Sequence, residues 1–274
     1  MPELPEVETI RAQLEPRLVG AELIDAGSHW SAKFTPALEV IGGEVRSVRR
    51  RGKYLLIDLD GPDEAPRELI IHLGMTGRLA VHDSADDVDL ADPYLRAWWR
   101  LDDGRIFTFH DVRRFGRIHC VDTGDHAGIP TLHALGPEPF TDAFNGRDLA
   151  AFVKKSNRHL KTILLGQRAV AGVGNIYADE ALWAARINPA TRRLSRERAD
   201  VLVETVRAAL RSGLDHGGTT LRDYVDSDGQ SGANQHELFC YGRGGEPCLR
   251  CGTELRRREL DARTTTWCPH CQAH

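Results

Sequence analysis

The start of the chain combines prolines and glutamates in a pattern that could perform covalent chemistry. Pro2 follows the initiator Met1, and Glu3 and Glu6 lie within the next four positions. If Met1 is removed, Pro2 carries a secondary α-amine, and a pKa near 8 leaves a useful fraction unprotonated at neutral pH. Attack of this amine on a sugar aldehyde carbon gives an iminium that cannot lose its charge through an N–H. That electron sink would drive elimination of a β-leaving group, with Glu3 and Glu6 as proton donors or acceptors.

The same stretch also has a purely structural interpretation. Pro5 suits the first turn of a helix, where acidic side chains complement the helix dipole. Apolar residues then recur at helical spacing, which predicts an amphipathic helix through Val7, Ile10, Leu14 and Leu18. Taken alone, these residues favour a helix start as the explanation of the glutamates, and the rest of the chain must decide.

The cysteines near the end of the chain predict a metal site. Four of the six follow the spacing Cys248-x2-Cys251-x16-Cys268-x2-Cys271, which is typical of one structural Zn²⁺ held by four thiolates. A closed site of this kind leaves no open coordination position, so we expect neither a catalytic metal nor an organic cofactor. Free or disulfide-linked cysteines are the weaker alternative in an intracellular chain.

The segment between the two cysteine pairs is rich in arginine. A metal-stapled hairpin that presents Arg256, Arg257, Arg258 and Arg263 suits contact with phosphates. For the first three a solvated charged hairpin is an equally good explanation, because Glu254, Glu259 and Asp261 are interleaved with them.

Three glycine-bearing turns could also contact a nucleic acid. The turn 171–174 directly precedes a helix, whose free N–H groups and Asn175 could bind an anion; the alternative is an ordinary turn with Asn175 as the N-cap. The turns 73–77 and 111–116 place Met75 and Phe115 beside glycines at strand ends. An exposed side chain there could wedge between stacked bases while an arginine fills the space left behind, although a methionine or phenylalanine is more often a core residue.

Length and composition indicate a globular protein of about two domains. The chain has 274 residues, of which 41% are hydrophobic and 28% charged. It contains no apolar run of membrane-spanning length and no secretory signal, so we expect an intracellular protein without a membrane partner. The net charge of −4 argues weakly against nucleic-acid binding. The charges are nevertheless segregated into a basic segment, 46–53, and an acidic segment, 83–92, so one face could still bind an anion.

The order of predicted elements gives the domain organisation. After the first helix, residues 21–121 are mainly strands, including 53–59, 68–73, 94–101, 105–110 and 116–121, which indicates an antiparallel sandwich or barrel. Two prolines at 137 and 139 mark a linker. Helices are then predicted at 148–156, 161–165, 175–186 and 195–215, followed by a polar, mobile loop at 226–233.

Together these motifs resemble one family, the bacterial formamidopyrimidine-DNA glycosylases. The resemblance covers essentially the whole chain. It rests on Pro2-Glu3-Leu4-Pro5-Glu6-Val7-Glu8, Arg51-Gly52-Lys53-Tyr54-Leu55, His72-Leu73-Gly74-Met75-Thr76-Gly77, Arg113-Arg114-Phe115-Gly116, Gly172-Val173-Gly174-Asn175-Ile176-Tyr177-Ala178-Asp179-Glu180, Tyr241-Gly242-Arg243 and the four cysteines.

The resemblance implies an α+β multidomain fold. Its parts would be an N-terminal helix with an antiparallel β-sandwich (1–130), a helix–two-turns–helix DNA-binding domain (131–236) and a four-cysteine zinc finger (237–274). It also implies a monomeric, cytoplasmic, nucleoid-associated enzyme of base-excision repair that acts on damaged double-stranded DNA. Such an enzyme removes oxidised purines as a glycosylase and cleaves the abasic site as a lyase, by β- and δ-elimination.

Residue roles follow from the same resemblance. Pro2 would attack C1′ of the damaged nucleotide, Glu3 would protonate the sugar ring oxygen or shuttle protons, and Glu6 would support it. Phosphate contacts around an extruded nucleotide would come from Lys53, Asn175 and Arg263. Met75, Arg113 and Phe115 would fill the void, and Lys161 would lie near the lesion. The motifs that carry these residues also place His72 and Arg114 among the expected DNA contacts.

The sequence departs from the family pattern in three places. Val112 stands where many members have proline, and Cys240 replaces an aliphatic residue. The loop that usually covers the damaged base has no aromatic residue at 232–236, which leaves the preferred lesion open. Two alternatives therefore remain: the same chemistry on oxidised pyrimidines, as in the endonuclease VIII type, and a catalytically silent DNA-lesion binder. Leu4 favours the purine branch, because the pyrimidine enzymes usually have glycine there.

Overall fold

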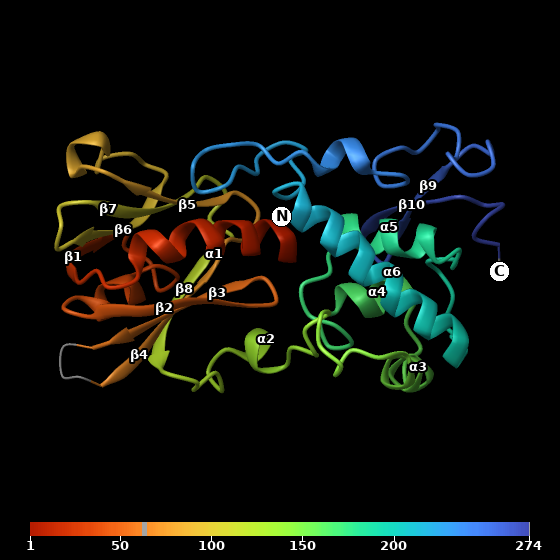
Figure 1. Cartoon of the computed structure of the whole chain (residues 1–274), viewed down its shortest axis with the longest axis horizontal. Helices are drawn as coiled ribbons and strands as arrows, with labels where there is room; N and C mark the ends of the chain where they lie inside the picture. Colours follow the sequence, from red (N-terminus) through yellow and green to blue (C-terminus); the bar gives the residue numbers. More distant parts are fainter. Residues whose placement is uncertain (62–64, 274) are drawn as a thin grey trace. The chain divides into compact units, whose positions relative to one another are not determined.

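A computed structural model describes residues 1–61 and 65–273 of the chain (Figure 1). The backbone contacts divide it into two compact units. The first comprises Met1–His133 with His216–Ala233, and the second comprises Ala134–Asp215 with Asn234–His274. The three domain ranges expected from the sequence stay a prediction. None of the described helices is long and apolar enough to cross a membrane.

The first unit begins with helix α1 (Leu4–Leu18), as the apolar spacing predicts. Val7, Ile10, Leu14 and Leu18 are all buried on one face of this helix. That face packs against strands β2 (Glu44–Arg51) and β5 (Gly77–His82), which are edge strands of two different sheets. The helix therefore closes one side of the unit and fixes where the chain terminus lies.

Two antiparallel four-stranded sheets form the body of the described first unit, which confirms the predicted sandwich. Trp99 and Phe109 of one sheet share a hydrophobic cluster with Leu55 and Ile57 of the other. One sheet has the order β1 (Leu23–Ser28), β6 (Leu95–Leu101), β7 (Ile106–Asp111), β5 (Gly77–His82). The other has the order β2 (Glu44–Arg51), β3 (Tyr54–Asp60), β4 (Pro66–His72), β8 (Arg117–Asp122). Short helices lie at η1 (Thr35–Val40), η2 (Ala85–Asp87) and α2 (Pro130–His133).

Two arginines of the basic segment 46–53 are paired with carboxylates of the same sheet. Arg46 pairs with Glu44 and Asp60 at 2.6 and 2.5 Å. Arg49 pairs with Asp58 of the adjacent strand at 2.5 Å and with Glu68 of the next strand beyond it at 2.6 Å. In an antiparallel sheet, residues on adjacent strands meet regardless of their distance in sequence. The charges of Arg46 and Arg49 are therefore balanced by carboxylates, and three of these, Asp58, Asp60 and Glu68, come from other strands of the sheet.

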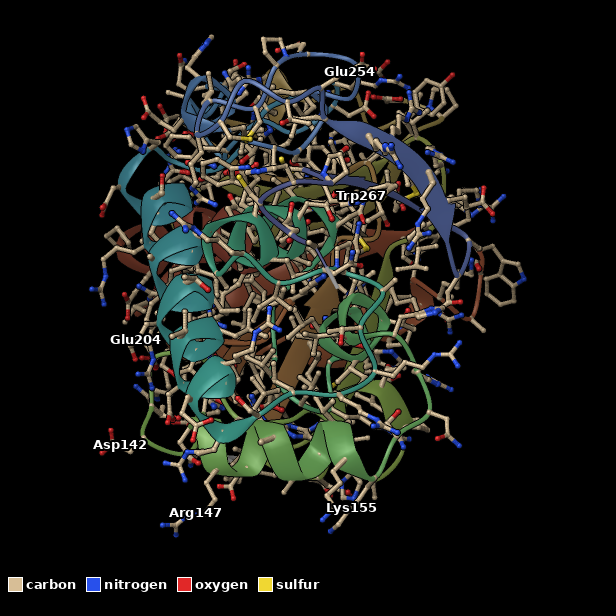
Figure 2. All side chains as sticks on the ribbon, turned by 90° about the vertical axis from the view of Figure 1, so that its right-hand side faces the viewer. Asp142, Arg147, Lys155, Glu204, Glu254 and Trp267 are labelled. Atoms are coloured by element: carbon tan, nitrogen blue, oxygen red, sulfur yellow. The ribbon has the colours of Figure 1, made fainter. Side chains whose placement is uncertain are left out.

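The described second unit is helical and ends in a hairpin. Its helices are α3 (Gly146–Lys154), α4 (Leu160–Leu165), α5 (Asn175–Ala184) and α6 (Arg196–Asp215), followed by η3 (Asn234–Glu237) and the strands β9 (Arg256–Leu260) and β10 (Arg263–Trp267). Figure 2 shows Arg147, Lys155 and Glu204 projecting outward. Helix α6 packs on α5 so closely that a Cβ on Gly213 would lie 2.3 Å from the Tyr177 hydroxyl. The four predicted helices are confirmed to within a few residues.

Candidate active site and nucleic-acid interface

The N-terminal stretch serves both as a helix start and as a buried acidic site. Glu6 accepts a hydrogen bond from the Glu3 N–H at 2.8 Å, which caps α1. Its second oxygen accepts from the Thr219 N–H at 2.7 Å and so holds the turn at 217–220. Pro2, Glu3 and Glu6 are buried. The structural interpretation of Glu6 is thus confirmed, and it places a carboxylate beside the chain terminus.

The terminal amine is held in an environment that favours its neutral form. In the full chain this amine belongs to Met1, and burial lowers its pKa below the ordinary 8.0. The nearby Lys53 ammonium lowers the pKa further, whereas Glu3, Glu6 and Asp223 oppose the shift. A neutral amine has the free electron pair that attack on carbon requires. The groups that act on the amine include three of the residues singled out from the sequence, all from the first unit.

His72 lies at the end of β4, next to the same group of residues. Its ring is 4.8 Å from that of Tyr54, and its Nδ1 accepts the Gly74 N–H at 3.2 Å. Burial lowers the pKa of His72 to about 4, with Lys53 and Arg117 as further causes. The imidazole is therefore neutral at physiological pH, and its Nε2–H is a hydrogen-bond donor.

This histidine should make the first unit less stable in mild acid. An unfolded histidine binds its proton near pH 6.5 and the folded one near pH 4, so stability falls as the pH drops between these values. Between pH 7 and pH 5, the free energy of unfolding of His72→Asn should therefore fall by about 2 kcal/mol less than that of the wild type. Urea unfolding at the two pH values measures this difference. The exposed His133 provides the control, since His133→Asn should keep the wild-type pH dependence. An unchanged pH dependence in His72→Asn would contradict the assignment.

The two turns with Met75 and Phe115 are locked to each other by one buried carboxylate. Asp111 accepts the Thr76 hydroxyl at 2.5 Å and the Gly116 N–H at 2.7 Å. The Thr76 oxygen in turn accepts the Arg113 N–H at 3.0 Å. The side chain at 111 was not singled out from the sequence, although it lies within the quoted turn, because its partner is 35 positions away.

The large side chains of these turns are outside the core. Met75 is 37% exposed and Phe115 is 50% exposed, so the interpretation of both as core residues is wrong. The Arg113 guanidinium lies 5.0 Å from the centre of the Phe115 ring. Arg114 adopts a left-handed φ of 57°, and its carbonyl accepts the Lys33 ammonium at 2.8 Å. Lys33 thus supports the turn 111–116, which contains Val112.

Asn175 is the first residue of α5 rather than its N-cap, which is Gly174. The N-cap interpretation of this asparagine is therefore wrong. Its side-chain oxygen is buried and accepts no hydrogen bond from any described residue. The preceding turn is braced by Gln167, which accepts the Gly172 N–H at 2.8 Å and donates to the Val173 carbonyl at 2.5 Å. The amide of Asn175 is not used to cap its own helix.

Lys161 is a fully buried lysine. Only 1% of its side chain is exposed, and its ammonium pairs with Asp179 at 2.7 Å. It also donates to the Thr264 carbonyl at 2.8 Å and to the Thr265 hydroxyl at 3.1 Å. A charge buried this deeply is stable only when it is paired and hydrogen-bonded. These contacts connect α4 and α5 to the strand that begins at Arg263.

The four C-terminal cysteines meet as the spacing predicts. The sulfurs of Cys248, Cys251, Cys268 and Cys271 all lie within 4.8 Å of one another. A tetrahedral zinc–thiolate site, with bonds of about 2.3 Å, needs sulfurs about 3.8 Å apart. The cluster thus fits one structural Zn²⁺. Cys240 is not one of the four sulfurs of this group. It is buried in the same small hydrophobic cluster as Cys248 and Cys268, and its thiol lies 3.2 Å from the Thr266 carbonyl.

The acidic end of the α5 motif also supports the finger, a role that sequence reasoning did not find. Glu180 accepts three backbone N–H groups, from Phe239, Cys240 and Tyr241, at 2.7–2.9 Å. Burial nevertheless raises the pKa of this carboxyl. The only signal in the sequence was two adjacent acids in a helix that is otherwise apolar.

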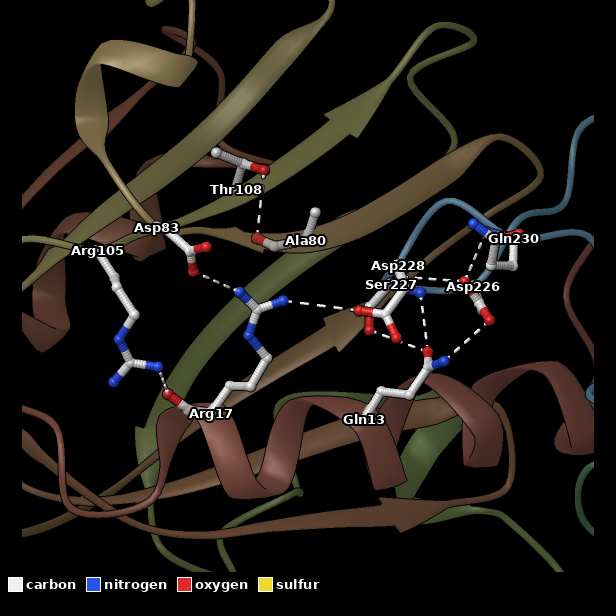
Figure 3. A network of polar contacts seen from close by, with 10 residues as sticks. All are labelled: Gln13, Arg17, Ala80, Asp83, Arg105, Thr108, Asp226, Ser227, Asp228 and Gln230. Carbon is white, nitrogen blue, oxygen red and sulfur yellow. Dashed lines mark hydrogen bonds and ion pairs between the residues drawn. The ribbon is translucent and has the colours of Figure 1, made fainter.

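The loop after α6 is anchored at its first half, contrary to the expectation of a mobile segment. Gln13 of α1 donates to the Asp226 carboxylate at 2.9 Å and accepts the Ser227 N–H at 3.0 Å (Figure 3). Arg17 lies 3.6 Å from Asp228. Such long-range contacts cannot be read from the polar composition of the loop.

Three profiles of known protein domains match successive parts of the chain. The sequence profile of the formamidopyrimidine-DNA glycosylase N-terminal domain matches residues 1–118, and that of the family's H2TH domain matches residues 135–225. A zinc-finger profile found in FPG and IleRS matches residues 245–273. These matches define the class of the protein: two DNA-glycosylase domains followed by a zinc finger.

Individual relatives narrow this class to one family. The formamidopyrimidine-DNA glycosylase of Deinococcus radiodurans is 40% identical, over 99% of this chain and 97% of its own length. The crystal structure of the MutM (Fpg) protein of Thermus thermophilus is 42% identical, with a TM-score of 0.89, and covers 100% of this chain and 99% of its own. A Lactococcus lactis Fpg complexed with DNA containing an abasic site is 32% identical, with a TM-score of 0.87, and covers 99% of this chain and 100% of its own. The chain belongs to the formamidopyrimidine-DNA glycosylase family.

Proposed function

We propose that this chain is a bifunctional DNA glycosylase and abasic-site lyase that removes oxidised purines from duplex DNA. The observation that carries the proposal is the chain terminus: Pro2 is buried there beside the buried carboxyl groups of Glu3 and Glu6, and burial and Lys53 lower the pKa of the Met1 amine that precedes it. The fold does not require an amine with a lowered pKa at this position. A nucleophile that must be neutral at physiological pH does require one. The solved relatives in complex with Fapy-dG and with abasic-site DNA support this substrate class.

The proposed reaction begins once Met1 is removed. The Pro2 nitrogen attacks C1′ of an extruded nucleotide, the C1′–N bond breaks, and the damaged base leaves with a proton. Glu3 protonates the ring oxygen, the sugar opens, and a cationic iminium forms at C1′. Loss of a C2′ proton then expels the 3′ phosphate, a second elimination expels the 5′ phosphate, and water releases Pro2. Extrusion is needed because the amine cannot reach C1′ inside a stacked duplex.

The DNA contacts belong to the same proposal. Lys53, His72, Asn175 and Arg263 would bind phosphates on either side of the extruded nucleotide. Met75, Arg113 and Phe115 would occupy the space that it leaves, and the latch from Asp111 to Thr76 would keep these side chains in register. Arg114 would contact the adjacent backbone, and buried Lys161 would act through the strand that it holds. We further propose that the protein works as a monomer on the nucleoid in the bacterial cytoplasm.

The decisive experiment is borohydride trapping on matched duplexes. One duplex carries 8-oxoguanine opposite cytosine, and the other carries an oxidised pyrimidine such as thymine glycol at the same position. We expect a covalent adduct with both, formed faster with 8-oxoguanine. No adduct from a protein whose mass shows that Met1 is absent would refute the enzyme and favour a silent lesion binder.

One observation keeps the pyrimidine alternative open. The segment 232–236, where the family usually carries aromatic residues over the damaged base, has none, and it leads into the short helix η3. Faster trapping with the oxidised pyrimidine in the same experiment would assign the chain to that branch without changing the proposed chemistry.

Lys53 should contribute one phosphate contact. Neutralising one phosphate releases about one counterion, so we expect Lys53→Ala to lower the slope of log Kd against log salt by about one. The measurement is fluorescence anisotropy with a duplex that carries a tetrahydrofuran abasic analogue. Arg46→Ala is the control, because it removes one positive charge from the same basic segment at a residue that is not among the expected DNA contacts, and it should keep the slope. An unchanged slope in Lys53→Ala would make Lys53 structural.

A further inference from the structure

We infer that His159, Thr162, Lys161 and Asp179 are positioning residues that fix the backbone on both sides of Arg263 before DNA binds. The inference rests on the proposed function, in which Arg263 contacts a phosphate. It assigns these side chains a role in recognition rather than only in holding the hairpin to the helices. All of the contacts involved lie within the second unit.

The hairpin that carries Arg263 has an unfavourable turn. Asp261 and Ala262 join β9 to β10, with left-handed φ angles of 48° and 60°. A two-residue turn of this type matches the twist of the strands, but it is normally made by asparagine or aspartate followed by glycine. Alanine pays a steric cost in this conformation. The turn therefore needs support from outside the hairpin.

That support comes first through Asp261. Its carboxylate accepts the His159 Nδ1–H at 3.0 Å and the Thr162 hydroxyl. The other ring nitrogen of His159 accepts from Arg192 at 3.2 Å, which selects the tautomer that donates to Asp261. The hydrogen bonds from Thr162 and His159 lower the pKa of the Asp261 carboxyl. The residue two positions before Arg263 is thus tied to the start of α4.

The second tie lies directly after Arg263. Lys161 donates to the Thr264 carbonyl at 2.8 Å and to the Thr265 hydroxyl at 3.1 Å. Its partner Asp179 accepts the Thr266 N–H at 3.0 Å. Lys161, Asp179, Thr265 and Thr266 are all buried, so these bonds are shielded from water. Three consecutive residues of β10 are therefore held by one buried ion pair.

Arg263 lies between these two sets of contacts, but its own side chain takes part in neither. Its side chain is exposed, and its guanidinium makes no hydrogen bond or ion pair with any residue that the structure describes. The backbone at Arg263 is already fixed, and its guanidinium is available to a phosphate. Binding therefore has to order only this side chain, which is what a preorganised recognition site requires. If the ties only stabilised the finger, the exposed position between them would have no particular importance.

A double-mutant cycle separates these two roles. Asp261→Gly removes the carboxylate but keeps the left-handed turn available, and it avoids the buried Lys161, whose loss could unfold the protein. It is combined with Arg263→Ala in the full-length, zinc-loaded chain. The control is Ala262→Gly, which changes the neighbouring turn residue and leaves both ties intact. Binding is measured on the tetrahydrofuran duplex at several salt concentrations, with zinc content and circular dichroism recorded for each variant.

We expect Arg263→Ala to weaken binding about tenfold and to lower the salt slope by about one. Asp261→Gly should weaken binding about fivefold and lower the slope in the same direction, yet have no further effect in the Arg263→Ala background. Ala262→Gly should stay within about twofold of wild type. Equal losses from Asp261→Gly in both backgrounds, or no loss in either, would overturn the inference. Borohydride trapping by the wild-type chain is scored separately, so failure of the proposed chemistry is distinguishable from failure of the positioning role.

Discussion

Pro2→Gly is expected to abolish most borohydride trapping and strand cleavage while leaving the fold intact. Glycine keeps an α-amine of similar pKa, but its imine can lose its charge through the N–H, whereas the proline iminium cannot. Glycine also lacks the ring that orients the attacking electron pair. We expect a loss of roughly 10²-fold or more in the rate of adduct formation on abasic DNA.

Pro5→Ala is the matched control for this prediction. It replaces a buried proline of the same helix start, three positions from the nucleophile, and should leave trapping unchanged. Wild-type trapping by Pro2→Gly, with Met1 absent in both proteins, would show that another amine reacts.

The same mechanism links activity to the processing of the chain end. With Met1 attached, the Pro2 nitrogen is an amide and has no electron pair to offer. Some preparations will contain chains with and without Met1, and mass spectrometry gives the fraction of chains that lack it. The fraction of chains trapped on DNA should not exceed this value. Burial lowers the pKa of the Met1 amine. We expect the buried position of Pro2 to act in the same direction on its freed amine and to keep trapping efficient below pH 8, where an exposed amine would be mostly protonated.

Features with a local cause were predictable from the sequence. The period of Val7, Ile10 and Leu14 predicted α1, and the spacing of the four cysteines predicted their cluster, because in both cases the partners are fixed by short-range geometry. The family resemblance supplied the residue roles, and these remain a proposal.

What could not be predicted depends on partners that are distant in sequence. Arg49 meets Glu68 only because β3 lies between β2 and β4. Lys161 is buried because Asp179 and the strand after Arg263 surround it. The single hint was its place in a short helix, Leu160–Leu165, in which four of the six residues are leucine or isoleucine. A polar residue in such a run can face a ligand or an internal partner, and a sequence pattern does not distinguish the two.

Removal of zinc should separate DNA binding from the stability of the first unit. Cys248 and Cys268 pack with Trp183, Leu255 and Cys240 in a small cluster of their own. None of the four metal ligands belongs to the sandwich core. Loss of the ion should therefore disorder the hairpin that carries Arg263, since structural zinc supplies folding free energy directly. The unfolding transition of the sandwich should remain.

Cys268→Ser and a strong chelator are two independent ways to test this. We expect either to weaken binding to the tetrahydrofuran duplex roughly 10²-fold, while urea unfolding of the first unit shifts little. Cys240→Ala is the matched control, because Cys240 is equally buried but lies outside the four-sulfur cluster. That variant should keep one zinc per chain and near-wild-type binding. Global unfolding on zinc removal, including the sandwich, would show that the metal supports both units rather than only the finger.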